Sequence, residues 1–327
     1  MSDAPRVLLV SLGATAGLRA SDAELAASIE RAGASVEVAV AAPPRPLRTL
    51  ALTDLGWAVA ARAAARAAIA RREPRAIVYS TITAALLAPA PGAIRFDALA
   101  AANRPGRHGV WQRRRERGVL ERAPLLVPVS EQALAGAPAR RARALVVPIA
   151  VAASGPPAPG GRDIAAITYA ADARKKGLDR VLAAWSDARR PGEELVVAGG
   201  AAHDAREGVR AVGALPRADY RALLRRARVY VAAPRREEYG IAQLEALADG
   251  AMLVAAPPPP PYPALALAAA ADARLVTTDL AGAIRIALDD PLPGYGAALA
   301  PLLEPFSPAS VDRVVADQLL PALLTRA

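Results

Sequence analysis

The chain has 327 residues, enough for two domains of ordinary size, and much of its 54% hydrophobic content is alanine. It has no cysteine, which excludes disulfides and thiolate metal ligands and fits a reducing compartment, and two histidines are too few for a His-rich metal site. The formal net charge of +10 lies entirely in residues 1–155, which carry 21 Arg against 11 acidic residues. This excess indicates either an anionic partner for the first half or a basic surface that only serves solubility.

The first half alternates strand and helix patterns in chain order. We predict a buried strand at Arg6–Ser11, a helix at Ser21–Arg31 that ends at Gly33, and a strand over residues 36–40. A long helix rich in Ala and Arg follows at Thr53–Arg72, and further strands are predicted at Ala76–Tyr79, Leu125–Val129 and Ala144–Pro148. Parallel strands with crossover helices predict a Rossmann-like open sheet.

A stretch rich in Pro and Gly, Ala152–Arg162, predicts an interdomain linker, after which the pattern restarts. Strands are predicted near Ile164–Tyr169, Glu194–Ala198, Val209–Val212, Val229–Ala232, Met252–Ala256 and Arg274–Val276. Helices are predicted near Gly177–Ala188, Arg217–Arg226, Gly240–Ala248 and Leu280–Leu288, with a last helix at about Pro308–Leu324. The sequence therefore predicts an α/β protein with domains at 1–155 and 156–305, and a C-terminal helix at 306–327 that packs back on the first domain. We expect a cleft between the domains, with ligands at the carboxyl ends of the strands. No segment is expected to span a membrane, because the longest uncharged stretches are interrupted by proline.

The only two lysines of the chain are adjacent, Lys175-Lys176, and stand immediately before Gly177. They fall at the turn between the strand Ile164–Tyr169 and the next helix. A lysine ammonium is a compact point charge that suits a phosphate oxygen. A solvated loop explains the pair equally well.

Two glutamates, Glu237 and Glu245, flank a glycine at the start of a predicted helix. The amides of Gly240, Ile241 and Ala242 would then lie at a helix N-terminus, where phosphate binds well. The carboxylates could accept hydrogen bonds from sugar or ribose hydroxyls, or they could simply cap the helix. A glycosidase pair is disfavoured, because such carboxylates must face each other across the scissile bond.

These segments carry a family resemblance. The stretches "TYAADARKKGLDRVLAAW" (Thr168–Trp185) and "PRREEYGIAQLEALADGAMLVAAP" (Pro234–Pro257) resemble the Lys-Gly stretch and the paired-glutamate signature of family-4 retaining glycosyltransferases, which have a GT-B fold and are also called glycosyl transferases group 1. The resemblance implies two Rossmann-like domains facing across a cleft. The second domain would bind a nucleotide-diphosphate sugar, and the first would bind an acceptor.

Residue by residue, the resemblance implies that Glu245 holds the ribose and Glu237 the transferred sugar. Lys176 and the amides of Gly240 and Ile241 would hold the diphosphate, and Val212 would lie beside the base. The resemblance further implies that no metal or other cofactor is needed, and the sequence has no Asp-x-Asp.

The sequence departs from the family in several places. Ala170 stands where the family commonly has Arg, so Arg174 and Lys175 are candidates to replace that charge. On the acceptor side, Gly13 begins an altered loop and Asp97 follows Phe96 where many members have His-Asp. These departures leave a second hypothesis open, a non-catalytic nucleotide-sugar-binding protein on the same fold.

The segment Arg104–Arg122 holds seven Arg, two Glu and Trp111, and we expect it to form a basic loop that includes His108 at the surface. It could contact an anionic membrane or an anionic, lipid-linked acceptor. Nucleic-acid binding is disfavoured, because nothing else resembles a nucleic-acid module. We expect the protein to be cytoplasmic and to lie peripherally at the inner face of the membrane.

Overall fold

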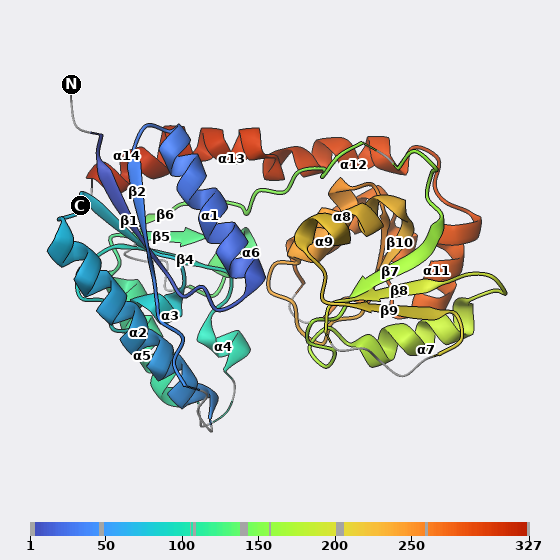
Figure 1. The fold of residues 1–327 in the computed structure, drawn as a ribbon, viewed down its shortest axis with the longest axis horizontal. Helices are drawn as coiled ribbons and strands as arrows, with labels where there is room; N and C mark the ends of the chain where they lie inside the picture. The colour runs from blue at the N-terminus through green and yellow to red at the C-terminus, as the bar shows by residue number, and fades with distance from the viewer. Residues whose placement is uncertain are drawn as a thin grey trace. The chain divides into compact units, whose positions relative to one another are not determined.

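The computed structural model describes residues 4–45, 49–104, 106, 109–137, 143–156, 158–200, 206–258 and 261–325. It divides the chain into two compact units. The first unit comprises Met1–Ala150 and Pro308–Ala327, and the second comprises Val151–Ser307. Each is an α/β unit with its own parallel sheet (Figure 1). The C-terminal segment therefore belongs to the first unit, while the connector after Ala150 belongs to the second.

The sheet of the first unit is parallel and has the order β2-β1-β3-β4-β5-β6. The strands are β1 (Arg6–Ser11), β2 (Ser35–Val40), β3 (Ala76–Tyr79), β4 (Ala93–Phe96), β5 (Leu125–Pro128) and β6 (Arg143–Ala144). Strand β4 was not predicted, because its apolar run is short and contains Arg95. That side chain is nonetheless buried, and its charge is compensated by Asp22.

Helices cover both faces of this sheet. They are α1 (Ala16–Arg31), α2 (Leu50–Arg71), α3 (Ile82–Ala85), α4 (Ala100–Asn103), α5 (Val110–Arg122), α6 (Glu131–Leu134), α13 (Pro308–Val314), the π-helix η4 (Val315–Leu319) and α14 (Leu320–Thr325). The expectation of a basic loop at Arg104–Arg122 is wrong for most of that segment, because α5 begins at Val110. Residues 105, 107 and 108, and with them His108, lie outside the described residues.

The two faces of the first sheet are packed differently. Alanines of α2 (Ala58, Ala61, Ala65 and Ala68) meet one face, where small side chains at helical spacing allow close approach. On the other face, α1 and the C-terminal helices share a core that includes Ile29, Val315 and Leu319. Asp312 of α13 accepts hydrogen bonds from Arg31 (2.8 Å) and Ser28 (2.5 Å) of α1. The last helices are thus integral to the first unit, although some 150 residues of the second unit precede them in sequence.

The sheet of the second unit is also parallel, with the order β11-β10-β7-β8-β9. Its strands are β7 (Ile164–Tyr169), β8 (Leu195–Ala198), β9 (Val209–Gly213), β10 (Ala227–Ala232) and β11 (Met252–Ala255). Its helices are α7 (Leu178–Ala188), α8 (Arg217–Arg226), α9 (Ile241–Ala248), α10 (Pro263–Ala271), α11 (Leu280–Asp289) and α12 (Tyr295–Leu303), with 3-10 turns η2 (Ala273–Leu275) and η3 (Glu304–Phe306). The strand predicted at Arg274–Val276 is wrong, because this segment is mostly the turn η2. Only Val276 makes an isolated parallel bridge, to Ala255.

The chain order in this second sheet reverses between β7 and β10. From β7 the chain continues to β8 and β9 on one side, and then crosses to β10 and β11 on the other. Loops that leave neighbouring parallel strands in opposite directions open a crevice at their carboxyl ends, where α/β proteins bind ligands. The loop with the two lysines follows β7, and the loop with Glu237 follows β10.

Candidate functional site

The loops after β7 and β10 are joined at the crevice through their backbones. The amide of Arg235 donates to the carbonyl of Lys175 (2.9 Å). Gly177, which has a φ of +65°, caps α7 and passes so close to the second loop that a Cβ there would lie 1.9 Å from the carbonyl oxygen of Ala233. Only glycine permits both this left-handed geometry and this approach. The glycine after the lysine pair therefore holds the two loops together.

Within this junction, Lys176 and Glu237 form an ion pair with Nζ and Oε2 2.5 Å apart. Both side chains are largely buried, with 20% and 8% exposure. The side-chain amide of Gln243, on α9, lies 3.4 Å from the same Oε2. A lysine ammonium has three N–H groups, and the pair with Glu237 uses one of them. Lys176 thus keeps donors for a second anionic partner.

The neighbouring lysine has a different partner. Lys175 donates to Glu238 (2.7 Å), which also accepts from Arg236 (2.8 Å). Burial opposes the ionisation of Glu238, but these two cations outweigh it, and the pKa of Glu238 is lowered. Glu238 therefore neutralises much of the charge that Lys175 would offer. The Arg174 side chain is exposed and has no hydrogen-bond acceptor among the described residues.

The loop after β10 leads directly into the start of α9. Gly240 caps it in the left-handed region, with a φ of +84°, and the ring of Tyr262 packs where its Cβ would be. The N–H groups of Gly240, Ile241 and Ala242 find no acceptor among the described residues. Such a helix start attracts anions through both its dipole and its free donors.

Glu245, one turn further along α9, is bound by two arginines of α8. Its Oε1 accepts from Arg217 (Nη2, 2.7 Å) and from Arg221 (Nη1, 3.3 Å). Arg221 is buried and also bonds Asp249 (2.6 Å) and the carbonyl of Ala152 (2.7 Å). Glu245 is therefore a buried carboxylate on α9 that is held by two cations.

The remaining predicted residues lie on other strand ends. Val212 is partly exposed near the carboxyl end of β9, where it is the extra residue of a bulge opposite β8. Gly13, after β1, and Asp97, after β4, belong to the carboxyl edge of the first unit's sheet. The structure thus brings together Lys175, Lys176, Glu237, Gly240 and Ile241, with Glu245 further along α9, whereas Gly13 and Asp97 are in the other unit.

Three residues of this site, Gln243, Arg217 and Arg221, were not predicted from the sequence. Gln243 lies two residues before Glu245 on α9, and this closeness to a predicted site residue is a weak indication of a role in the site. The arginines precede Glu245 by 24 and 28 residues and reach it only because α8 packs on α9. No local pattern could have shown that contact.

A second missed group lies in the first unit at the carboxyl end of β1. Ser11 donates to Asp22 (2.5 Å), and Arg95 donates to Asp22 (3.3 Å) and Ser21 (2.7 Å), all of them buried. Burial raises the pKa of Asp22, although Ser11 and Arg95 oppose the shift. The group compensates the charge of Arg95 within the first core.

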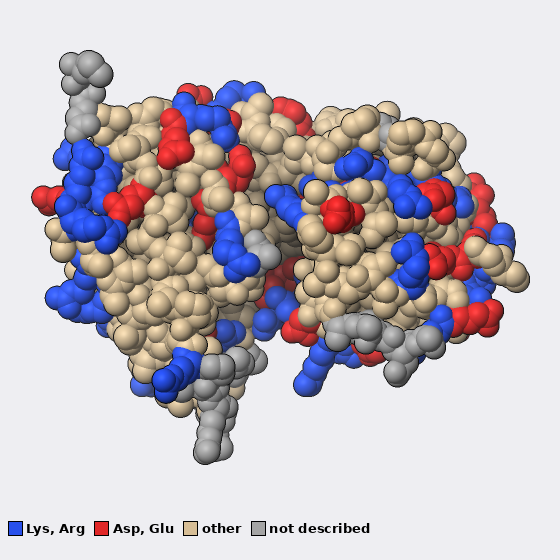
Figure 2. Space-filling view, in the orientation of Figure 1, with Lys and Arg blue, Asp and Glu red and all other residues tan. Residues whose placement is uncertain are grey.

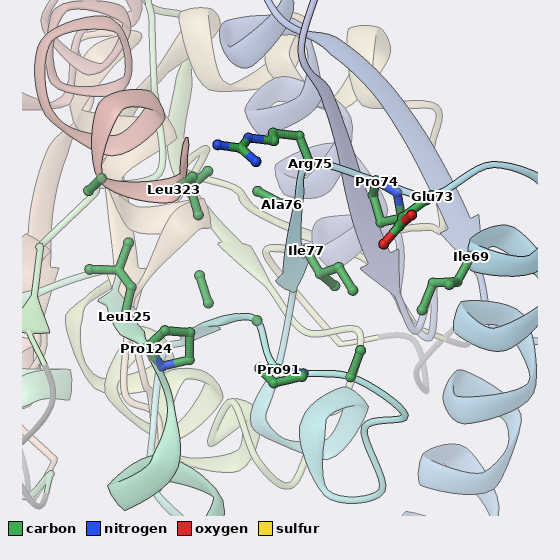
Figure 3. Close-up of a pocket in the computed structure, with 14 residues that line it drawn as sticks. Ile69, Glu73, Pro74, Arg75, Ala76, Ile77, Pro91, Pro124, Leu125 and Leu323 are labelled. Carbon is green, nitrogen blue, oxygen red and sulfur yellow. The ribbon is translucent and has the colours of Figure 1, made fainter. Parts of the chain in front are cut away.

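A surface pocket lies elsewhere, at the amino ends of β3, β4 and β5. Ile69, Ile77, Pro91, Pro124, Leu125 and Leu323 line it, with Glu73 and Arg75 at its edge (Figure 3). Its lining is chiefly aliphatic and includes none of the predicted residues. We therefore place the chemistry at the carboxyl edge of the second sheet instead.

The described residues contain no cluster of three or more His, Cys, Asp or Glu that could hold a metal ion. Among them, too, no helix is both long and apolar enough to cross a membrane. On the face of the second unit shown in Figure 2, basic and acidic side chains are interspersed. Surface ion pairs of this unit include Arg226–Asp163 and Arg210–Glu194.

The two Rossmann-like units, each with its own parallel sheet, have the architecture of the GT-B class of α/β folds. Residues 157–292, which make up most of the second unit, match the family glycosyl transferases group 1.

Among solved structures, HepE of Anabaena in complex with UDP-glucose is similar, with a TM-score of 0.71, 16% identity, and 97% of this chain and 99% of that chain covered. Sucrose-phosphate synthase of Thermosynechococcus elongatus gives a TM-score of 0.69 at 16% identity, covering 99% and 100%. WaaG, a glycosyltransferase involved in lipopolysaccharide biosynthesis, gives 0.64 at 16% identity, covering 96% and 95%. No curated protein sequence matches this chain. The comparisons confirm the predicted GT-B fold and the likeness of the second half to glycosyl transferases group 1.

Proposed function

We propose that this protein is a glycosyltransferase that moves a sugar from a nucleotide-diphosphate sugar to an acceptor with retention of configuration and without a metal. The observation that carries the proposal is the group at the reversal point of the second sheet. There Lys176 and Glu237 lie on two joined loops, beside the amides at the start of α9 that have no acceptor among the described residues. The family match of this unit and the UDP-glucose bound by HepE support a nucleotide-sugar donor.

Each group has a distinct task in the proposed transfer. When the bond between the anomeric carbon and the diphosphate oxygen breaks, its electron pair goes to that oxygen. An acceptor hydroxyl oxygen bonds the anomeric carbon from the same face, and its proton passes to the departing diphosphate. Lys176 and the amides of Gly240 and Ile241 stabilise the charge that develops on the diphosphate, which is the role otherwise given to a divalent metal. Glu237 accepts hydrogen bonds from hydroxyls of the transferred sugar, and Glu245 accepts from the ribose. Val212 lies beside the base.

The acceptor is proposed to bind the first unit near Gly13 and Asp97. Both residues follow strands at the carboxyl edge of that sheet, where ligands of parallel sheets gather. Replacing Asp97 with Asn should raise the KM for the acceptor more than the KM for the donor. A larger effect on the donor would contradict this assignment.

The test of the donor site uses Lys176→Ala and Glu245→Ala, with binding of UDP, GDP, ADP and dTDP and their sugars measured by calorimetry. Arg190→Ala, which removes a surface pair with Asp289, is the control. We expect Lys176→Ala to lower turnover by about 10²–10³-fold, as for a lost transition-state donor. Variants that fold normally and bind the nucleotide as well as the parent would refute the assignment.

The second candidate, a non-catalytic nucleotide-sugar-binding protein, is favoured by two observations. Ala170 is buried where the family commonly places Arg, and Lys175 is neutralised by Glu238. This candidate would be selected if the protein binds a nucleotide tightly but neither transfers the sugar nor hydrolyses the donor. Donor hydrolysis that depends on Lys176 would eliminate it.

We further propose that α5 contacts an anionic membrane surface or a lipid-linked acceptor at the inner face of the membrane. Val110 and Trp111 are 37% and 41% exposed at the start of this helix. Arg114 and Arg117 are exposed beside them and have no acceptor among the described residues. Each basic group near an anionic surface adds about 1 kcal/mol. Flotation with vesicles of increasing anionic lipid tests this, and binding that ignores lipid charge would refute it.

A further inference from the structure

A second surface pocket of the first unit lies beside α5, and the proposed sugar transfer does not use it. It has a volume of about 330 Å³ and adjoins the pocket of Figure 3, with which it shares Pro91 and Pro124 among its lining residues. Helix α5 contributes Arg115, Val119 and Arg122 to its lining. Of the described residues that line it, only the two arginines are charged, and most of the others are aliphatic. The pocket therefore combines two cations with a largely apolar lining.

These two arginines have no carboxylate partner among the described residues. Arg115 donates from Nε to the carbonyl of Leu86 (2.9 Å), and no other acceptor lies within its reach in the described part of the chain. Arg122 is exposed and has no acceptor there. In the second unit, by contrast, Arg210 and Arg226 are paired with carboxylates. Because a guanidinium has five N–H donors, four of Arg115 and all five of Arg122 remain for a ligand.

The segment 88–92, which lines the pocket together with α5, is held firmly against β3. The hydroxyl of Tyr79 donates to the carbonyl of Ala90 (2.8 Å). A Cβ at Gly92 would lie 2.7 Å from the carbonyl oxygen of Ile77 and 2.9 Å from Cε2 of Tyr79, so the backbone passes directly against the strand. A site that is already formed loses little conformational freedom when a ligand binds.

We propose that this pocket binds an organic phosphate, with its phosphate group on Arg115 and Arg122 and its apolar part on the aliphatic lining. Guanidinium N–H groups match phosphate oxygens in pairs. A phosphate monoester has three terminal oxygens and up to two negative charges, so it can accept from both arginines at once. Burial of an alkyl group against Val119 and the prolines adds to the affinity.

This ligand chemistry has two sources, the phosphate of a membrane lipid and a soluble phosphate ester. The proposal goes beyond sugar transfer and does not depend on it, because none of the residues assigned to the donor or to the acceptor lines this pocket.

The experiment measures binding of hexyl phosphate, inorganic phosphate and hexanol to the full chain by calorimetry, at one pH and one ionic strength. We expect hexyl phosphate to bind about tenfold or more tightly than inorganic phosphate, the gain from burying about two methylene groups, and hexanol not to bind detectably. Arg115→Gln and Arg122→Gln should each raise the Kd for hexyl phosphate about tenfold, the loss expected for a hydrogen bond to a charged group.

Arg117→Gln is the matched control, because Arg117 lies on the same helix and is exposed but does not line the pocket. It removes the same charge and should change the Kd by less than about threefold. The proposal is overturned if the parent does not bind hexyl phosphate, if inorganic phosphate binds as tightly, or if Arg117→Gln weakens binding as much as the two pocket variants do.

Flotation with vesicles that contain phosphatidic acid then separates the two sources. If Arg115→Gln and Arg122→Gln weaken vesicle binding more than Arg117→Gln does, the pocket takes the phosphate of a membrane lipid. If the three variants float alike while only the pocket variants lose hexyl phosphate, the ligand is a soluble phosphate ester.

Discussion

The pair of Lys176 and Glu237 gives the most direct test of the site's electrostatics. Replacing Lys176 with Met keeps the bulk of the side chain. Among the described residues, it leaves the Glu237 carboxylate, which is 8% exposed, with only the side-chain amide of Gln243, 3.4 Å away. The attraction between unit charges 2.5 Å apart is about 7 kcal/mol at an effective dielectric constant of 20. Part of it is cancelled by the desolvation of both groups.

Removal of one partner from a buried pair typically costs about 3–5 kcal/mol. Because the Lys176 side chain is 20% exposed, we expect a loss of about 2–4 kcal/mol in the free energy of unfolding. Glu237→Gln should cost only about 1 kcal/mol, since the remaining ammonium can reach water. The double variant should lose less than Lys176→Met alone, because no uncompensated charge is then left.

Trp185 offers a local reporter for this measurement. It is fully buried in α7, the helix that begins directly after Lys176 and Gly177. In a background with Trp57→Phe and Trp111→Phe, urea unfolding followed by fluorescence therefore reports on the second unit. Stability of Lys176→Met within 0.5 kcal/mol of the parent would refute the reasoning.

Three further predictions concern the fold. Burial raises the pKa of Glu116 from 4.5 to about 7. The parent should therefore lose up to about 3 kcal/mol of unfolding free energy as the pH rises between these values, whereas Glu116→Gln should not. The same pH dependence of the unfolding free energy in both proteins would contradict this. Gly177→Ala should destabilise the second unit by more than 2 kcal/mol, because its Cβ collides with backbone. Gly192→Ala, at a φ of +83° but in open space, should cost only about 1–2 kcal/mol in the same assay, and equal losses would argue against the close contact. Asp312→Ala should lower the free energy of unfolding by less than about 1 kcal/mol. It should nevertheless speed proteolytic removal of the C-terminal helices, because it breaks their polar contact with α1. An unchanged rate of cleavage would contradict this role of Asp312.

The residues just after the strands of the second sheet were predictable from the sequence. Each of the apolar runs at β7 and β10 is followed by a polar loop, and Gly177 and Gly240 mark the starts of the next helices. Residues close together in the chain therefore indicate strand, loop and helix start. Lys176 and Glu237 were therefore assigned to strand-to-helix turns that the structure confirms. Two elements of the first unit were misjudged because their local signals are atypical. Strand β4 contains a buried arginine, and α5 is so rich in arginine that it resembles a solvated loop.

The alternation of strands and helices can be predicted from the amino-acid sequence, and so can the chemical groups that follow each strand. Both depend on residues that are neighbours in the chain. The tertiary structure decided the partners. Whether Lys176 faces Glu237, whether Glu238 neutralises Lys175 and whether Arg217 occupies Glu245 depend on strand order and helix packing. These contacts join residues 28 to 63 positions apart, and only folding brings such charges within a few ångströms.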